Sequence, residues 1–216
     1  MHDQSDGYVT VSGEGVHETE VNRSRFRCVL APVATEEEAR RLVGRIRAEH
    51  PTAGHHCWAY VLGADAELQR ASDDGEPSGT AGVPMLRMLL RRDTRNVVAV
   101  VSRWFGGTKL GAGGLIRAYG GAVGAALDSL GTVTRRRRRL AAVTVGHERA
   151  GRLENALRAA GHEVHDVRYG AEATIELALP AAEVASFRAW LDDTTSGSAH
   201  LELLGETYGT AGSDAP

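Results

Sequence analysis

The chain of 216 residues has few cysteines, few aromatic residues and almost no lysine. Its two cysteines, Cys28 and Cys57, stand far apart and form no CxxC pair, which argues against a disulfide framework and against a zinc site. No apolar run approaches the ~18 residues of a membrane span, and the polar first residues do not resemble a signal peptide. We therefore expect a cytoplasmic protein that does not associate with a membrane.

The sequence also lacks an excess of basic charge. Lys and Arg total 25 and Asp and Glu total 28, so the net charge of −3 gives no global argument for nucleic-acid binding. Aromatic residues make up only 5%, which leaves aliphatic side chains to fill the core. The basic residues instead gather locally, at Arg87, Arg91, Arg92, Arg95 and Arg103 and then in the run Arg135–Arg139.

Apolar spacing in the first half changes repeatedly between strand and helix periods. Strand patterns cover residues 26–33, 56–62 and 96–102, the last of them apolar as in a buried central strand. Helical patterns follow Thr35, which can form a capping box with Glu38, then Pro84, and then the glycine-rich segment before Leu115. Three glycines inside the last helix predict close packing on a sheet: Gly120, Gly121 and Gly124.

The second half shows a simpler order of elements. Strand patterns cover residues 140–145, 164–169, 173–179 and 200–204. One helical pattern between them is closed by Gly161 and the other is opened by Pro180. The order βαββαβ predicts a ferredoxin-like antiparallel sheet with two helices on one face. We expect an α+β protein with domains at 1–133 and 134–208, followed by a disordered tail at 209–216.

Three segments carry a resemblance to a known family: His55–Tyr60, Asp73–Leu86 and Val101–Tyr119. In this order they are similar to the IMPACT domain, and residues 134–208 look like the additional C-terminal domain of the bacterial YigZ-like members (an Impact N-terminal or UPF0029 domain followed by a DUF1949-like domain). Trp104 stands where tyrosine is common in the family. The resemblance implies a first domain like domain 2 of ribosomal protein S5. It implies a second domain like the last domain of elongation factor G, and a role in the regulation of translation.

The glycine-rich segment after residue 102 is a candidate anion site. Its glycines can point several backbone N–H groups into a concave turn, and the helix that follows adds its positive end. The alternative is a tight turn that needs glycine only for positive φ. The residues concerned are Arg103, Trp104, Phe105, Gly106, Gly107, Lys109, Gly111, Gly113 and Arg117.

A second helix start lies at Ser78 and the glycines after it, where hydroxyl and amide groups could either cap the helix or bind an anion. The acids before it, Asp73, Asp74 and Glu76, predict a solvated loop rather than a metal site. His56 and Trp58 share one strand face and could stack a base, or could be half-buried.

Alternate arginines of the basic run, Arg135, Arg137 and Arg139, could form a phosphate-binding stripe or a solvated edge strand. No catalytic team, cofactor or metal site is recognisable. We expect a binding protein for RNA or the ribosome, with a phosphate-bearing ligand as a further candidate partner. The alternatives are an enzyme acting on a phosphorylated small molecule or nucleotide, and an adaptor for a protein partner.

Overall fold

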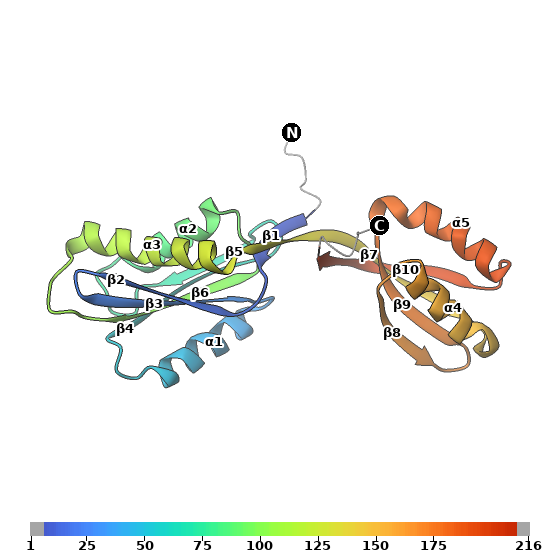
Figure 1. Ribbon diagram of the computed structural model, residues 1–216, viewed down its shortest axis with the longest axis horizontal. Helices are drawn as coiled ribbons and strands as arrows, with labels where there is room; N and C mark the ends of the chain where they lie inside the picture. The colour runs from blue at the N-terminus through green and yellow to red at the C-terminus, as the bar shows by residue number, and fades with distance from the viewer. Residues whose placement is uncertain (1–6, 211–216) are drawn as a thin grey trace. The chain divides into compact units, whose positions relative to one another are not determined.

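The computed structural model describes residues 7–210, which divide into two compact units (Figure 1). Residues 8–134 form the N-terminal unit, and residues 135–210 with Gly7 form the C-terminal unit. Each unit contains an antiparallel sheet and helices, so the predicted two-part α+β architecture is confirmed. Within the described residues, no helix is long and apolar enough to cross a membrane.

The N-terminal unit is a five-stranded sheet between two layers of helix. The strand order is β2 (Gly15–Val21), β3 (Ser24–Pro32), β6 (Val97–Trp104), β4 (His55–Leu62) and β5 (Leu68–Ser72). One face is covered by α1 (Glu36–Glu49), and the other by α2 (Gly82–Arg91) and α3 (Gly111–Leu130) (Figure 1). The capping box is present, since the Glu38 amide donates to the Thr35 hydroxyl.

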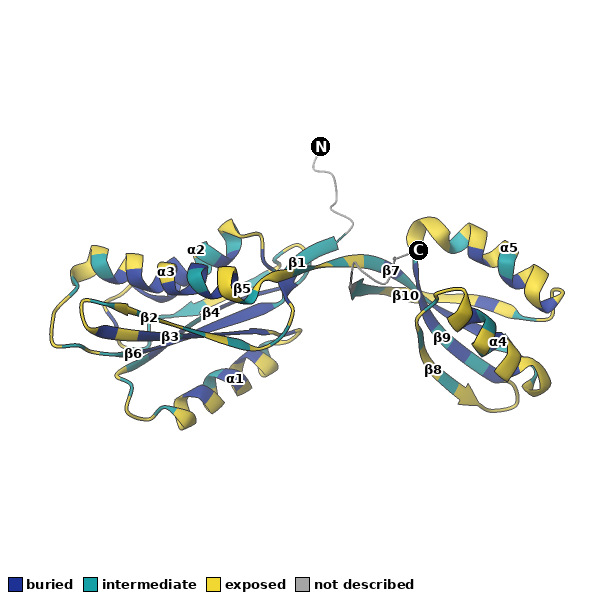
Figure 2. Ribbon diagram, viewed as in Figure 1, coloured by how far each residue is buried: buried dark blue, intermediate teal, exposed yellow. Residues whose placement is uncertain are grey.

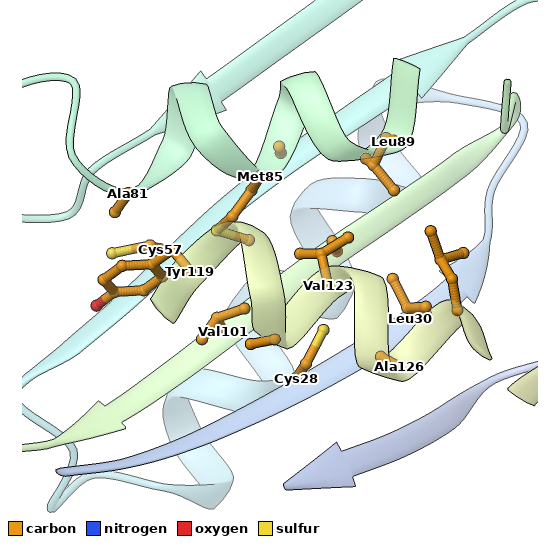
Figure 3. Packing of buried hydrophobic residues seen from close by; sticks show 14 of the residues in the cluster. Cys28, Leu30, Cys57, Ala81, Met85, Leu89, Val101, Tyr119, Val123 and Ala126 are labelled. Atoms are coloured by element: carbon orange, nitrogen blue, oxygen red, sulfur yellow. The ribbon is translucent and has the colours of Figure 1, made fainter. Parts of the chain in front are cut away.

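The central strand β6 supplies both cores of this unit. Val97, Ala99 and Val101 pack against α2 and α3, whereas Val98 and Val100 pack against α1. All five are fully buried, as expected for a central strand without polar alternation (Figure 2), and Figure 3 shows Val101 among side chains of the α2–α3 core. In β3, β4 and β6, successive residues therefore alternate between the core beneath α1 and the core beneath α2 and α3.

The glycines inside α3 serve a helix contact rather than the predicted sheet contact. A Cβ at Gly120 would lie 3.6 Å from the Pro84 oxygen, and one at Gly124 would lie 3.4 Å from Met88 Cε. The same offset of 36 residues joins Arg92 to Asp128 in an ion pair of 2.7 Å. Helices α2 and α3 thus run side by side in the same direction, while Gly121 faces open space.

The C-terminal unit has the predicted element order. Its elements are β7 (Thr132–Val145), α4 (His147–Ala159), β8 (Val164–Tyr169), β9 (Ala173–Pro180), a short 3-10 turn (Ala181–Glu183), α5 (Val184–Thr195) and β10 (His200–Thr210). The strands are ordered β10-β7-β9-β8, and Gly7, the first residue of β1 (Gly7–Val11), belongs to this unit. Residues of α4 and α5 such as Leu157 and Leu191 pack on Val143 and Ile175 from one face.

Three strands are absent from the sequence prediction, namely β1, β2 and β5. The hairpin of β2 and β3 turns through Asn22 and Arg23, both with positive φ, and no glycine marks this turn. Strand β10 also runs to Thr210, past the predicted strand end at residue 204. Residues 1–6, and the part of the expected tail from 211 to 216, lie outside the described residues.

Candidate functional site

The glycine-rich loop between β6 and α3 packs on the β2–β3 turn. A Cβ at Gly106 would collide with the backbone of Arg23 and Ser24, and the Gly106 amide donates to Ser24 Oγ at 3.1 Å. Gly107 and Gly111 have φ of +84° and +67°, which favour glycine. Turn geometry and close backbone approach therefore account for Gly106, Gly107 and Gly111. This agrees with the alternative stated from the sequence, namely a tight turn that needs glycine for its conformation.

The start of α3 nevertheless has no acidic partner of its own. Its N-cap residue is Leu110, no side chain of the described residues caps it, and no acid lies in its first turn. Gly111 and Gly113 are exposed there, and a Cβ at Gly113 would lie 3.6 Å from Arg117 Nη1. Beside it, a cavity of about 320 Å³ opens between the β2–β3 turn and α3, lined by Val21, Asn22, Leu110, Gly114, Arg117 and Ala118.

The start of α2 is different, because Asp73 occupies it. The Asp73 carboxylate accepts hydrogen bonds from the amides of Gly79 (2.8 Å), Ala81 (3.0 Å) and Gly82 (2.8 Å). Burial alone would raise the pKa of the Asp73 carboxyl, but these three donors outweigh it and hold the pKa below its usual value. The amides after the exposed Ser78 are therefore not open to an external anion, and the anion role considered for this helix start is wrong.

The neighbouring acids also have partners within the protein. Asp74 accepts from Arg47 (2.6 Å) and from the His56 amide (2.7 Å). Glu76 is buried and accepts from Arg103 and from the Tyr119 hydroxyl, each at 2.7 Å. The prediction of a solvated acidic loop is therefore wrong. Among the described residues, no group of three or more His, Cys, Asp and Glu could hold a metal ion.

Arg103 belongs to this internal network and not to the surface. Its side chain is 8% exposed, and besides Glu76 it contacts Ser24 Oγ at 3.4 Å. Its guanidinium lies 5.5 Å from the ring of Phe26 and 5.7 Å from that of Phe105. Arg103 thus holds a buried carboxylate in place and supports one side of the exposed Phe105, so it is not free to bind phosphate as the sequence suggests.

His56 and Trp58 lie on the α1 face, together with Trp104. His56 is 5% exposed, and its Nδ1 lies 2.9 Å from Ser102 Oγ. Burial lowers the pKa of His56, so its imidazole is held neutral inside the sheet layer. Trp58 is stacked on Tyr60 with 5.5 Å between ring centroids. The shared face is as predicted, but a buried His56 cannot stack an incoming base.

Trp104 makes local contacts as well. Arg25 lies over its ring at 4.0 Å, and its indole N–H donates to Thr52 Oγ1 at 3.1 Å. Its neighbour Phe105 is 60% exposed beyond the end of β6. Among His56, Trp58, Trp104 and Phe105, Phe105 is therefore the residue whose ring is largely open to a ligand.

The arginine run forms a paired strand. Arg138 is buried, while Arg137 and Arg139 reach Glu206 at 3.5 and 2.9 Å. Strand β7 pairs with β9 on one side and with β10 on the other, where Arg135 lies opposite Thr210. Both sequence predictions for this segment are therefore wrong: Arg137 and Arg139 are paired with an acid and do not form a free phosphate-binding stripe, and β7 has a partner strand on each side and is not an edge strand.

Both parts of the chain match known protein families. Residues 22–127 match the Impact N-terminal domain, and residues 143–198 match a domain of unknown function, DUF1949. IMPACT family member YvyE of Bacillus subtilis is 41% identical over 201 residues, which cover 93% of this chain and 93% of that protein. The chain belongs to the IMPACT family.

Other relatives agree with this assignment. IMPACT family member YigZ of Escherichia coli is 42% identical over 87% of this chain and 93% of its own length. Protein IMPACT of Xenopus laevis is 34% identical, over 47% of this chain and 32% of that protein. A crystal structure described as that of an hypothetical protein has a TM-score of 0.70 and 38% identity, and covers 92% of this chain and 97% of that one.

In this IMPACT family member, the charges of the N-terminal unit are distributed unequally between its two faces. Every arginine of α1 has an acidic partner: Arg40, Arg41, Arg45 and Arg47. Helices α2 and α3 contain one acid, Asp128, which pairs with Arg92. Within residues 7–210, five exposed cations near these helices and the glycine-rich loop have no ion pair: Arg23, Arg87, Arg91, Lys109 and Arg117. We call these five residues the basic surface.

Arg23 is the member of this set that the sequence does not reveal. It lies in the β2–β3 turn, and its backbone contacts Gly106 of the loop. A hairpin is usually marked by Asn-Gly, and here arginine takes the second turn position with φ of +64°. The local signal that could have revealed this turn is the alternation of half-buried and exposed residues along β2, followed by Asn22, a residue type that is common in turns.

Proposed function

We propose that this protein binds RNA through the basic surface, in a translation-associated role. The observation that carries the proposal is the gathering of unpaired cations on the α2–α3 side, while the arginines of α1 are neutralised by acids. Unpaired guanidinium and ammonium groups bind phosphates by displacing counterions, and this term supplies most of the affinity of sequence-independent binding. The role in translation rests on the family resemblance.

The exposed ring of Phe105 supports single-stranded RNA as the form that is bound. Stacking of one base on an aromatic side chain contributes ~1–3 kcal/mol and tolerates any base. Phe105 stands four positions before Lys109 in the same loop, so we expect the phosphates of a stacked base to meet the basic surface there. Ribosomal RNA is one natural source of such a strand.

The architecture supports the finer fold names as part of the same proposal. The strand order β10-β7-β9-β8, with α4 and α5 on one face, supports a ferredoxin-like C-terminal unit like the last domain of elongation factor G. The N-terminal sheet with helices on both faces supports the proposed likeness to domain 2 of ribosomal protein S5.

The test is fluorescence anisotropy with a labelled single-stranded RNA over a range of salt concentrations. If all five cations contact phosphates, the log–log salt slope is about −3.5, and each cation removed reduces it by ~0.7. Lys109→Gln and Arg117→Gln should each weaken binding and flatten the slope. Arg70→Gln is the matched control, because Arg70 is exposed and has no ion pair among residues 7–210, but lies opposite Tyr60 on the α1 face of the sheet.

Two results would overturn the proposal. One is the absence of binding at low salt, both to the oligonucleotide and to purified ribosomal subunits. The other is a loss of affinity in Arg70→Gln equal to that in Arg117→Gln, because total charge and not the basic surface would then govern binding.

A further inference from the structure

A cavity in the C-terminal unit, separate from the basic surface, offers a second group of polar donors. It has a volume of about 340 Å³ and lies between α4 and the end of α5. It is lined by Arg149, Arg152, Leu153, Ala156, Thr194, Thr195 and Ser196. No carboxylate is among these residues, and the volume is within the ~300–1,000 Å³ range of small-ligand sites.

We propose that this cavity, the α4–α5 cavity, binds a phosphate group. Arg149 and Arg152 stand three positions apart on α4 and so face the same side of the helix. Within residues 7–210, Arg152 has no acidic partner and no hydrogen bond, so its whole guanidinium fork is open for a bidentate contact. The hydroxyls of Thr194 and Ser196 are exposed at the same opening.

Arg149 is held in place before any ligand arrives. Its Nη1 donates to the Thr195 carbonyl at 2.9 Å and to Ser198 Oγ at 2.5 Å, while Nε and Nη2 make no such bonds within the described residues. A guanidinium that is already ordered loses little conformational freedom on binding a ligand. The geometry therefore combines one positioned cation with one that has no partner within residues 7–210.

The end of α5 would oppose an anion if its carbonyl groups were unsatisfied, because a helix C-terminus is a negative pole. Here the carbonyl groups have partners: Leu191 accepts from Thr195 Oγ1 (2.7 Å), Asp192 accepts from the Gly197 amide (2.9 Å), and Thr195 accepts from Arg149. The turn that makes this possible has left-handed Ser196 and Gly197, at φ of +53° and +71°. The negative pole is thus largely compensated where the cavity opens.

The remaining wall indicates what else the ligand carries. Leu153 and Ala156 give the cavity a small apolar side, and a phosphate alone would leave much of the volume empty. A phosphate ester with a compact organic group fits this combination. Its source is either a small phosphorylated molecule or a phosphate in RNA. Binding here does not depend on the basic surface, so the two proposals fail or succeed separately.

The experiment is a two-dimensional ¹H–¹⁵N NMR titration of the full chain at constant ionic strength. The probes are inorganic phosphate, ribose 5-phosphate and a short single-stranded RNA. We expect saturable shifts of the amides of Arg149, Arg152 and residues 194–196. Arg152→Gln should raise the Kd for inorganic phosphate by about tenfold, because one charged hydrogen-bonding partner is lost. Arg188→Gln should leave it unchanged, because Arg188 is an exposed arginine of α5 outside the cavity.

The outcomes separate the sources as well as the proposal. Tighter binding of ribose 5-phosphate than of RNA assigns the cavity to a small molecule, and shifts of the same amides by RNA assign it to phosphodiesters. The proposal is overturned if no probe produces saturable shifts at these amides. It is equally overturned if Arg152→Gln and Arg188→Gln, both folded by circular dichroism, change the Kd to the same extent.

Discussion

Replacing Asp73 by asparagine should destabilise the N-terminal unit by about 2–3 kcal/mol at neutral pH. The carboxylate accepts from three amides, of Gly79, Ala81 and Gly82. An asparagine oxygen can keep the latter two bonds as neutral ones, each weaker by ~1 kcal/mol, and loses the first, worth ~1.5–3 kcal/mol. Partial exposure to solvent reduces the sum to the stated range.

The pH dependence of the unfolding free energy provides a second, independent test of this prediction. The folded-state pKa of Asp73 lies below its unfolded value of about 3.9, so the carboxylate stabilises the fold above pH ~4. That contribution is lost as the pH falls through the lowered folded-state pKa. The difference in unfolding free energy between the wild type and Asp73→Asn should therefore be constant from pH 5 to 8 and shrink below pH ~4.

The assay is urea denaturation followed by tryptophan fluorescence in a Trp190→Phe background, so that only Trp58 and Trp104 of the N-terminal unit report. Asp65→Asn is the control, because Asp65 is exposed and its free energy should change by less than ~0.5 kcal/mol. A difference below ~0.5 kcal/mol for Asp73→Asn, or one that persists undiminished at pH 3, would refute the capping role.

Three further outcomes follow from local geometry. Gly121→Ala should stabilise α3 by ~0.5–1 kcal/mol, whereas Gly106→Ala should lower Tm by several degrees because its Cβ meets backbone; differential scanning calorimetry compares the two. Glu76→Gln leaves the Arg103 guanidinium buried without a counter-charge and should cost ~3–5 kcal/mol in urea denaturation, unlike the exposed Glu67→Gln. Burial raises the pKa of Cys57 to about 12, so this thiol should react with iodoacetamide only in urea; labelling of the native protein at pH 8 would contradict this.

The parts of the fold that sequence predicts well are those where periodicity and local chemistry agree. The uniform apolar run of β6, the Thr35 cap and the βαββαβ order of the second half each follow from a pattern within a few residues. Strand β2 was not predictable in this way, because its turn lacks glycine, and β5 is a short polar edge strand. A turn at Asn22 and Arg23 depends on the packing of Gly106 against it, which is a long-range contact.

Side-chain partners were harder to predict than elements. The sequence places Asp73, Glu76 and Arg103 in the right region, but their roles depend on contacts across 6 to 43 residues of chain, such as Glu76 with Tyr119. Likewise, the arginines of β7 become part of a paired strand through Glu206, far along the chain. Spacing gives the face on which a residue lies, and only the folded chain shows whether that residue is already satisfied.

One feature of the sequence that indicates the basic surface is a shortage of acidic residues along the segment that forms α2 and α3. Between Glu76 and Asp128 the chain contains a single acid, Asp93, and seven basic residues. Basic residues on a face that has few acids have few partners for ion pairs. A long acid-poor stretch over two adjacent helices therefore predicts positive charge that is not neutralised.

The two helix starts of the N-terminal unit show why that shortage matters. A helix N-terminus is available to an external anion only if the chain does not supply an anion itself. Helix α2 follows an acidic segment, and Asp73 fills its amides. Helix α3 follows Lys109 in a stretch without acids, and no side chain of residues 7–210 caps it. Two segments that look alike by their glycines thus differ by one carboxylate, and for that reason we propose the side of α3 and its neighbouring cations as the surface that binds RNA.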